Sequence, residues 1–246
     1  MTRRILVTGA RRGIGAALAI GLAEPDRTLV LHHLAAPDEV AKVARRCEER
    51  GAEVLEFEAD LSDPAAVCDL AERAGPVDVL VNNAARASNV DIRELPLGEW
   101  QQTFAVNVTA PMLLAQAFAT GMAERGWGRI VNITSATVRL GGPSGPSYVS
   151  SKAALVGLTR SLARALGRSG ITVNAISPGA IRTEGELELA GGQEDPAATA
   201  QTLAAQAIPR QLVPDDLVAT VRYLVSDGAS ATTGQVIEVG AGLVYR

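Results

Sequence analysis

Short apolar runs rich in valine and isoleucine alternate along the chain with longer segments rich in alanine, leucine, glutamate and arginine. Most of the runs are too apolar for strands with one solvated face, so the alternation indicates parallel strands joined by helical crossovers. We expect an α/β protein with a single-domain Rossmann fold, in which a doubly wound, seven-stranded parallel sheet carries helices on both faces. The predicted strands are Arg4–Thr8, Thr28–His33, Glu53–Glu58, Val77–Asn82, Arg129–Thr134, Thr172–Ile176 and Gln235–Val239.

The length and charge of the chain limit its organisation and partners. Its 246 residues fit one doubly wound domain, so residues 1–246 are expected to form a single dinucleotide-binding and catalytic unit. A net charge of -4 without long basic runs argues against a nucleic-acid partner. The first apolar run, Ile5–Val7, is too short for a signal peptide or a membrane span, so we expect a cytoplasmic protein without a membrane partner. Cys47 and Cys68 are expected to be reduced packing residues, and no metal site is predicted.

A glycine-rich turn follows the first predicted strand and opens an alanine-rich segment, in the sequence Thr8-Gly9-Ala10-Arg11-Arg12-Gly13-Ile14-Gly15. Glycines suit a dinucleotide site because a Cβ atom would block the tight turn and the approach of backbone N–H groups to a pyrophosphate. The alternative is a plain strand-to-helix turn that happens to be rich in glycine.

The end of the second predicted strand bears on the choice of cofactor. An NAD site usually has a carboxylate there for the ribose 2′-hydroxyl, but this chain has His32, His33 and Leu34. A 2′-phosphate would be attracted by Arg11 or Arg12, so the pattern favours NADP(H) over NAD(H). The alternatives are arginines on a solvated loop and imidazoles that are simply packed or exposed at a strand end.

Tyr148 and Lys152 are four residues apart, which makes them neighbours on one face of a helix. A phenol with a pKa of about 10 is a poor base at pH 7, and a nearby cation favours its ionised form. The pair therefore predicts a tyrosine acid or base with a lysine activator, although the spacing alone is a weak signal.

Together, these motifs resemble the short-chain dehydrogenase/reductase family, with most similarity to the 3-oxoacyl-[acyl-carrier-protein] reductases and related ketoreductases. The resemblance covers nearly the whole chain in the family's order. Beyond the turn and the Tyr148–Lys152 pair, it is carried by Asp60, Asn82-Asn83-Ala84, Asn107, Ser135 and Pro178–Thr183. The chain departs from the usual pattern at Ala85, where a glycine is common, and at Val239–Gly242, where an acidic-Gly-Gly sequence is more usual.

The resemblance implies a role for each of these residues. Ser135 would hydrogen-bond the substrate carbonyl and Tyr148 would protonate it. Lys152 would hold the nicotinamide ribose and lower the tyrosine pKa, and Asn107 would support a water linked to that lysine. The implied cofactor contacts are Gly9, Arg11, Arg12, Gly13, Ile14, Gly15, His33, Asp60, Leu61, Asn83, Ala84, Tyr148, Lys152, Pro178, Gly179, Ile181 and Thr183.

Among these contacts, Asp60 would meet the adenine, Asn83 and Ala84 the adenosine ribose, and Ile181 with Thr183 the carboxamide. Ordinary structural roles are the alternatives: a strand-end cap for Ser135, a polar helix residue for Asn107, a turn former for Asp60 and an N-cap for Thr183.

The predicted function is hydride transfer between NADP(H) and a ketone or 3-oxoacyl substrate, small or carrier-bound. The alternatives are an NAD-dependent secondary-alcohol dehydrogenase and a non-catalytic cofactor-binding sensor or scaffold. Arg125, Arg129 and Arg168 are candidates for basic residues beside the mouth of the site, with ordinary helix-end charges as the alternative.

The resemblance also suggests a homotetramer or homodimer that pairs helices around Pro111–Arg125 and Val149–Arg168. Glu184–Arg210 is predicted to be a substrate lid, in which a helix over Ala197–Ala207 lies between flexible glycines and Pro209. The glycines are Gly185, Gly191 and Gly192.

Overall fold

The computed structural model describes residues 2–189, 192–193 and 195–245. Its seven strands form one parallel sheet in the order β3-β2-β1-β4-β5-β6-β7, which confirms the predicted fold class. Each strand begins and ends within two residues of its predicted limits. The strands are β1 (Arg3–Val7), β2 (Arg27–His33), β3 (Glu53–Glu58), β4 (Val79–Asn82), β5 (Gly128–Ile133), β6 (Ile171–Pro178) and β7 (Val236–Val239).

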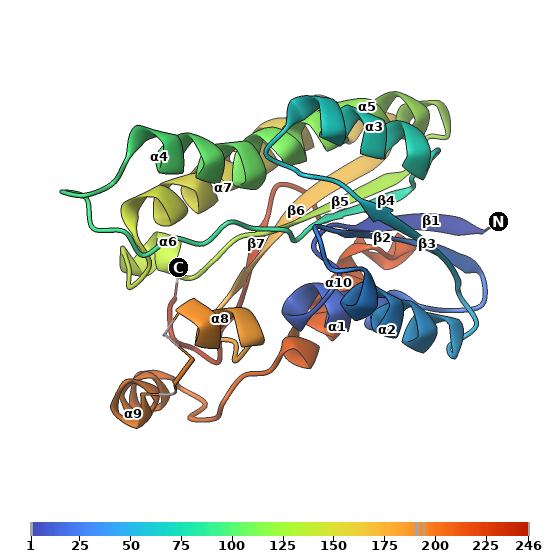
Figure 1. Ribbon diagram of the computed structural model, residues 1–246. Coiled ribbons are helices and arrows are strands. Elements are labelled where there is room, and N and C mark those ends of the chain that lie inside the picture. Colours follow the sequence, from blue (N-terminus) through green and yellow to red (C-terminus); the bar gives the residue numbers. More distant parts are fainter. Residues whose placement is uncertain (1, 190–191, 194, 246) are drawn as a thin grey trace.

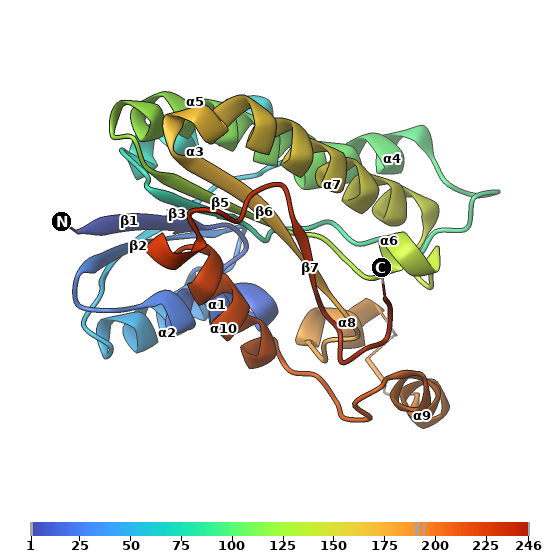
Figure 2. The ribbon, with the colours of Figure 1, turned by 180° about the vertical axis from the view of Figure 1, so that it is seen from behind.

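Two helical layers enclose the sheet, as Figures 1 and 2 show from opposite sides. One layer contains α1 (Gly13–Leu22), α2 (Pro37–Glu48) and α10 (Val218–Leu224). The other contains α3 (Pro64–Ala74), α4 (Leu97–Phe104), α5 (Ala110–Glu124) and α7 (Pro146–Leu166). Ile5 and Val7 of β1 pack into the first layer's apolar cluster, whereas Leu6 packs into the second. Because both faces are covered, every residue of β4, β5 and β6 is buried.

A continuous helical segment runs through α4, the π-helical turn η1 (Ala105–Thr109) and α5. This segment, Leu97–Glu124, is long and apolar enough to cross a membrane by length and composition alone. In the fold it packs against α3 and α7 in the layer over the sheet. The length criterion is therefore weak evidence for a membrane span.

The short elements α6 (Thr137–Leu140), α8 (Glu184–Leu189) and α9 (Pro196–Ala205) lie beyond the carboxyl ends of the strands (Figure 1). The predicted lid helix is therefore present as α9, but it ends two residues early. Asp195 caps it by accepting hydrogen bonds from the N–H groups of Ala197 and Ala198. Of the predicted flexible glycines, Gly192 has a φ of +81°, and Gly191 lies outside the described residues.

The two cysteines differ in their surroundings. Cys47 is buried on α2, as predicted for a packing residue. Cys68 is exposed on α3, so the packing role predicted for it is wrong. The helical period places Val67 and Leu70 in the core instead, which turns the intervening Cys68 outward.

Candidate active site

The glycine-rich turn joins the end of β1 to the start of α1, beside the end of β4. Gly9 has a φ of +66° and Gly13 a φ of +55°. A Cβ atom on Gly9 would lie 2.9 Å from the Ala84 Cα atom, and one on Gly15 would lie 2.1 Å from the Gly9 carbonyl oxygen. Glycine is therefore required at Gly9 and Gly15 for close packing. Among the described residues, no side chain caps the first turn of α1, which suits this helix start to an anion such as a pyrophosphate.

Thr8 and Asn83 hold the turn against β4. The N–H groups of Asn83 and Ala84 donate to Thr8 Oγ1 at 2.9 and 3.0 Å. Asn83 Nδ2 donates to the carbonyl oxygens of Thr8 and Gly9 at 2.9 and 3.2 Å. The predicted ribose residues Asn83 and Ala84 thus lie at the turn and help to define its shape, while their contact with the ribose stays a prediction.

The two histidines of β2 are buried. Of the ordinary structural roles considered for them, packed imidazoles rather than exposed ones match this position. His33 Nδ1 accepts a hydrogen bond from the Ala36 N–H at 3.4 Å. His32 contacts the Gly9 N–H and the Ala59 carbonyl oxygen, and burial lowers its pKa to about 4. His32 is therefore neutral at pH 7, and sequence reasoning assigned it no contact.

The arginines predicted to meet a 2′-phosphate are both paired with carboxylates. Arg11 Nη1 lies 3.2 Å from Glu39 Oε2, and the Arg12 guanidinium forms a two-pronged ion pair with Glu188 of α8. The Glu188 hydrogen bond raises the pKa of Arg12. Both arginines line a cavity of about 530 Å³ between α1 and α2, which Lys42 also lines. The guanidiniums thus face a space that could receive an anion, in competition with two glutamates.

The predicted catalytic residues converge beside the ends of β5 and β6. Lys152 is 2% exposed, and its Nζ atom donates to the Ile133 carbonyl oxygen at 2.7 Å. Burial lowers the pKa of Lys152 to about 8. Ser135 follows β5, and its Oγ atom accepts hydrogen bonds from the N–H and Oγ1 groups of Thr137 at 3.2 and 2.9 Å.

Burial also raises the pKa of Tyr148, and a hydrogen bond with Ser135 opposes this rise. The lowering of the tyrosine pKa that we expected from Lys152 is not found in this structure. The Lys152 Nζ atom lies 5.6 Å from the centre of the tyrosine ring and is held by Ile133 rather than by the phenol. The Tyr148 phenol is therefore protonated at pH 7.

Asn107 lies in the π-helical turn η1 and connects the loop after β4 to α7. Its Nδ2 atom donates to Ser151 Oγ at 2.8 Å, and its Oδ1 atom accepts from the Arg86 N–H at 2.8 Å. Ser151 Oγ donates in turn to the Tyr148 carbonyl oxygen at 2.7 Å. The support of a water by Asn107 stays a prediction. Sequence reasoning missed Ser151, although its position between Tyr148 and Lys152 was a usable signal.

A series of buried side-chain hydrogen bonds fixes α7 to the sheet. Asn82 Nδ2 donates to Asn132 Oδ1 at 2.8 Å, and Asn132 Nδ2 donates to Thr159 Oγ1 at 2.9 Å. Since Thr159 belongs to α7, these hydrogen bonds join β4, β5 and the helix that carries Tyr148 and Lys152. Asn132 and Thr159 gave no signal in the sequence because they are ordinary polar residues in a strand and a helix.

The segment after β6 crosses to the glycine-rich turn. A Cβ atom on Gly13 would lie 3.5 Å from the Thr183 Cβ atom, so Thr183 stands beside the start of α1. Ile181 is buried and pairs with Leu212 in an isolated parallel bridge. Because this segment reaches both ends of the site, contacts of Pro178, Gly179, Ile181 and Thr183 with a nicotinamide stay a reasonable prediction.

Asp60 and Leu61 follow β3 at the same edge of the sheet. Asp60 Oδ1 accepts hydrogen bonds from the Ser62 N–H and Oγ groups at 2.8 and 2.7 Å, as expected of a turn former. Leu61 is buried in the apolar cluster between the sheet and the helical layer that includes α3. The exposed Asp60 stands at the surface, where its proposed adenine contact stays a prediction.

The basic residues expected beside the mouth of the site lie at the opposite edge of the sheet. Arg125 pairs with Asp78 at the start of β4, Arg129 is buried near the start of β5, and Arg168 precedes β6. Of the two alternatives, ordinary structural charges therefore describe these arginines, because parallel strands place all their starts at the end of the sheet away from the catalytic residues.

Comparisons with known proteins agree with this geometry. The family model described as enoyl-(acyl carrier protein) reductase matches residues 9–244. The probable galactose dehydrogenase of Rhizobium meliloti is 36% identical over 98% of this chain and 94% of its own.

Two solved structures are also similar over nearly their whole length. A protein assigned as an NAD(P)-dependent gluconate 5-dehydrogenase from Beutenbergia cavernae, with bound NADP, has a TM-score of 0.91 at 36% identity over 98% of this chain and 96% of its own. A 3-oxoacyl (acyl-carrier-protein) reductase from Agrobacterium tumefaciens, also with NADP bound, has a TM-score of 0.90 at 32% identity over 98% and 93% of the two chains.

Proposed function

The chain belongs to the short-chain dehydrogenase/reductase family of oxidoreductases, and from this premise we propose that it reduces a ketone with NADPH. Members of this family use NAD(P) and act on CH–OH and C=O groups. The nicotinamide supplies or accepts the hydride when it is bound. The chain's own residues must then bind the carbonyl oxygen, supply a proton to it and keep the cofactor in place.

The observation that carries the proposal is the placement of Ser135 against the buried Tyr148 phenol, with Lys152 one turn along the same helix. A protonated phenol is the form that an acid needs for protonating a carbonyl oxygen during reduction. Ser135 lies within hydrogen-bonding reach of this phenol and can donate to the same oxygen as negative charge develops there. The buried ammonium of Lys152 would bind the ribose hydroxyls with its remaining N–H groups.

Two observations favour NADPH as the cofactor. Arg11 and Arg12 stand at the turn, and His33 ends β2 where an NAD site usually has a carboxylate. Two similar proteins have been solved with NADP bound. Because Glu39 and Glu188 already hold the arginines, a 2′-phosphate would have to displace a carboxylate from at least one of them.

The cofactor test is a matched pair of substitutions. Arg12→Ala should weaken NADPH binding about tenfold, because a charged hydrogen bond contributes about 1.5–3 kcal/mol, and should leave NADH unchanged. Glu188→Gln should strengthen NADPH binding and not NADH binding, because Arg12 is released from its carboxylate. Equal changes for both cofactors in titrations with each variant would remove Arg12 from the phosphate site.

The physiological substrate is proposed only as a class: a small or carrier-bound carbonyl compound. The names of similar proteins include sugar and 3-oxoacyl substrates, so the informative screen contains keto-sugar acids and 3-oxoacyl thioesters with both cofactors. Alcohol oxidation with NAD alone would favour the dehydrogenase alternative. Tight cofactor binding without turnover on any substrate would favour a sensor or scaffold.

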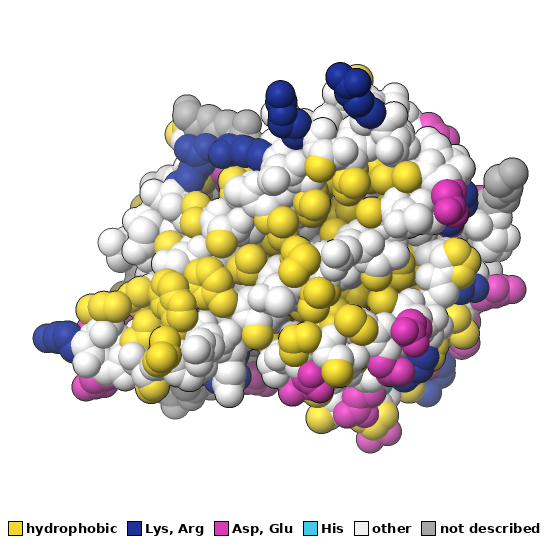
Figure 3. Space-filling model, turned by 90° about the horizontal axis from the view of Figure 1, so that it is seen from above, with side chains coloured by type: hydrophobic (Ala, Val, Ile, Leu, Met, Phe, Trp, Pro, Cys, Tyr) yellow, Lys and Arg dark blue, Asp and Glu magenta, His cyan; other side chains and the backbone are white. Residues whose placement is uncertain are grey.

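We also propose a cytoplasmic homotetramer or homodimer that buries the face formed by α3, α4, α5 and α7. Figure 3 shows a broad apolar area on this face, and Met112 of α5 is among its exposed side chains. Only 33% of the most apolar window of Leu97–Glu124 is buried in the isolated chain. Light scattering should give a mass well above 25.5 kDa, and Met112→Asp should lower it.

The segment from Glu184 to Arg210 is proposed to close over the substrate. Among its described residues, α9 has no buried side chain, so little packing holds it in place. Hydrogen exchange should slow progressively from the free protein to the cofactor complex and then to a complex with an unreactive substrate analogue. Equally fast exchange in all three states would contradict a lid.

A further inference from the structure

We propose that His32 is a positioning residue of the cofactor site, because its neutral imidazole fixes the backbone of Gly9 and ties the glycine-rich turn to the end of β3. The Gly9 N–H donates to His32 Nδ1 at 3.0 Å, and His32 Nε2 lies 3.0 Å from the Ala59 carbonyl oxygen. The side chain is therefore a bridge between two loops that both lie at the carboxyl edge of the sheet. The inference rests on the proposed cofactor site.

The two contacts determine the form of the ring. Nδ1 accepts a hydrogen bond, so the proton of the neutral imidazole must be on Nε2, which donates to Ala59. A protonated Nδ1 would set one donor against another at Gly9. His32 is 3% exposed, and its burial keeps the ring uncharged at neutral pH. The imidazole thus acts as a fixed acceptor rather than as a proton carrier.

The bridge also limits which N–H groups can meet a pyrophosphate. The Gly9 N–H is used by the imidazole, its carbonyl oxygen is used by Asn83, and the Ala10 N–H donates to the His32 carbonyl oxygen at 2.9 Å. The free donors therefore begin later in the turn, toward the uncapped start of α1. His32 supports these donors by holding the first half of the turn, and it touches no phosphate itself.

An aliphatic residue at this strand end could not accept the hydrogen bond from the Gly9 N–H group. Without an acceptor from β2, the Gly9 N–H would be left unpaired at a closely packed position, where a missing partner costs about 1–3 kcal/mol. The turn could relieve this cost only by moving, and Ala84 and Asn83 pack closely against the side of Gly9 where a Cβ atom would lie. Loss of the imidazole acceptor should therefore displace the site that receives the cofactor.

Two amide substitutions separate the two halves of the bridge. His32→Asn can place an amide oxygen near the position of Nδ1 and accept from Gly9, but it is too short to reach Ala59. His32→Gln can place an amide nitrogen near the position of Nε2 and donate to Ala59, but it leaves Gly9 without its acceptor. Val30→Ala removes buried volume from the same strand without touching the turn and is the control for lost stability.

Fluorescence titration should show that His32→Gln weakens NADPH and NADH about equally, by about tenfold, since a lost hydrogen bond near 1.4 kcal/mol changes affinity by that factor. His32→Asn should stay within about threefold of the wild type, and Val30→Ala should not change either affinity. At saturating cofactor, turnover of His32→Gln should fall less than the affinity does. Equal affinities for the Asn and Gln variants would overturn the proposal, as would a loss confined to NADPH.

A second readout is independent of cofactor and turnover. In the free protein, nitrogen-15 shifts of the His32 ring should report the neutral form with its proton on Nε2. The Gly9 amide should exchange slowly in the wild type and in His32→Asn, and quickly in His32→Gln. A proton on Nδ1, or equal exchange at Gly9 in all three proteins, would refute the bridge. These measurements stand even if no ketone proves to be a substrate, so failure of the proposed function would be distinguishable.

Discussion

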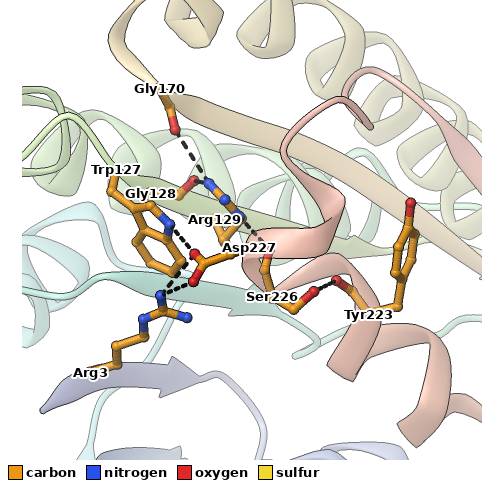
Figure 4. A network of polar contacts seen from close by, with 8 residues as sticks. All are labelled: Arg3, Trp127, Gly128, Arg129, Gly170, Tyr223, Ser226 and Asp227. Atoms are coloured by element: carbon orange, nitrogen blue, oxygen red, sulfur yellow. Dashed lines mark hydrogen bonds and ion pairs between the residues drawn. The ribbon is translucent and has the colours of Figure 1, made fainter. Parts of the chain in front are cut away.

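A buried cation lies at each end of the parallel strands, one where the strands begin and one where they end. The two cations are held very differently. At the edge where the strands begin, Arg129 is 2% exposed and donates to the carbonyl oxygens of Gly128, Gly170 and Ser226 (Figure 4). At the edge where they end, the hydrogen bonds found for Lys152 include only one acceptor, the Ile133 carbonyl oxygen. Among the described residues, the guanidinium donates three hydrogen bonds to backbone carbonyls and the ammonium donates one, so the ammonium keeps donors for a ligand.

The surroundings of Arg129 strengthen this contrast. The indole of Trp127 lies between two guanidiniums, with Arg3 at 4.0 Å and Arg129 at 4.3 Å from its ring centre. Asp227 accepts from Trp127 Nε1 at 2.8 Å and pairs with Arg3 at 2.9 Å (Figure 4). This closed network pins the segment after α10 to the sheet. The comparison teaches that a buried charge held by several elements of the protein serves the fold, whereas one held by a single acceptor marks a functional site.

The largest effect should follow from Tyr148→Phe. The ring still packs, but the proton donor is gone, and general acid catalysis contributes about 10²–10⁴ in rate. Steady-state kinetics should show this loss in kcat, while cofactor titration and thermal unfolding stay near the wild type. Turnover close to normal would remove the tyrosine from the reaction.

Lys152→Met should lower turnover and cofactor affinity together, by about 10- to 100-fold, since a hydrogen bond from a charged group contributes about 1.5–3 kcal/mol. At pH 7 the variant should nevertheless be more stable by about 2 kcal/mol. Burial lowers the lysine pKa from 10.5 to about 8, which costs the folded wild type about 3 kcal/mol, and the lost Ile133 hydrogen bond offsets about 1 kcal/mol.

The pH dependence gives the sign of this effect. Below about pH 8 the lysine is charged in both states, so the cost is fully present; between about 8 and 10.5 the unfolded chain binds more protons, and the wild type gains stability as the pH rises. The advantage of Lys152→Met should therefore shrink over that range in urea unfolding. A constant difference from pH 7 to 10.5 would contradict a buried charged lysine.

Arg129→Met should show the reverse pattern. Removal of the guanidinium leaves buried carbonyl oxygens without donors and should lower the free energy of unfolding by about 3 kcal/mol. Because the network lies at the far edge of the sheet, kcat and KM should stay within about twofold at temperatures where the protein is folded. A large loss of activity in a folded variant would break the comparison between the edges.

Asp227→Asn should give the smallest effect. The carboxylate is largely exposed, and exposed ion pairs contribute about 0–1 kcal/mol. An asparagine can still accept from the Trp127 indole, so the midpoint of thermal unfolding should fall by a few degrees at most. Equal destabilisation by this variant and Arg129→Met would show that the network acts as one unit around the aspartate.

Predictions from the sequence succeeded where a local pattern decides the outcome. The runs rich in valine and isoleucine predicted all seven strands, because strands covered on both faces are built largely from apolar residues. The glycine spacing predicted a turn at whose tightest points, Gly9 and Gly15, a Cβ atom is excluded. The i, i+4 spacing placed Tyr148 and Lys152 on one helix, as observed.

Predictions failed or were missing where contacts join residues that are distant in the sequence. The contact of His32 with Gly9 spans 23 positions, and that of Arg12 with Glu188 spans 176. Neither partner carries a local signal, since each depends on how loops meet at the end of the sheet. For Arg129 and Arg168 the predicted strand starts already favoured the ordinary alternative, because residues at the starts of parallel strands lie away from the catalytic end.

Gly179 and Gly240 contact each other just after β6 and β7, and the two positions differ in whether they can accept a larger residue. A Cβ atom on Gly179 would lie 2.7 Å from the Gly240 Cα atom, whereas one on Gly240 would lie 3.4 Å from the Gly179 Cα atom. Alanine is therefore sterically forbidden at Gly179 but fits at Gly240 with ordinary contacts. Of two glycines that touch each other, only one excludes a methyl group, and a library of alanine variants at both positions should recover Gly240→Ala alone.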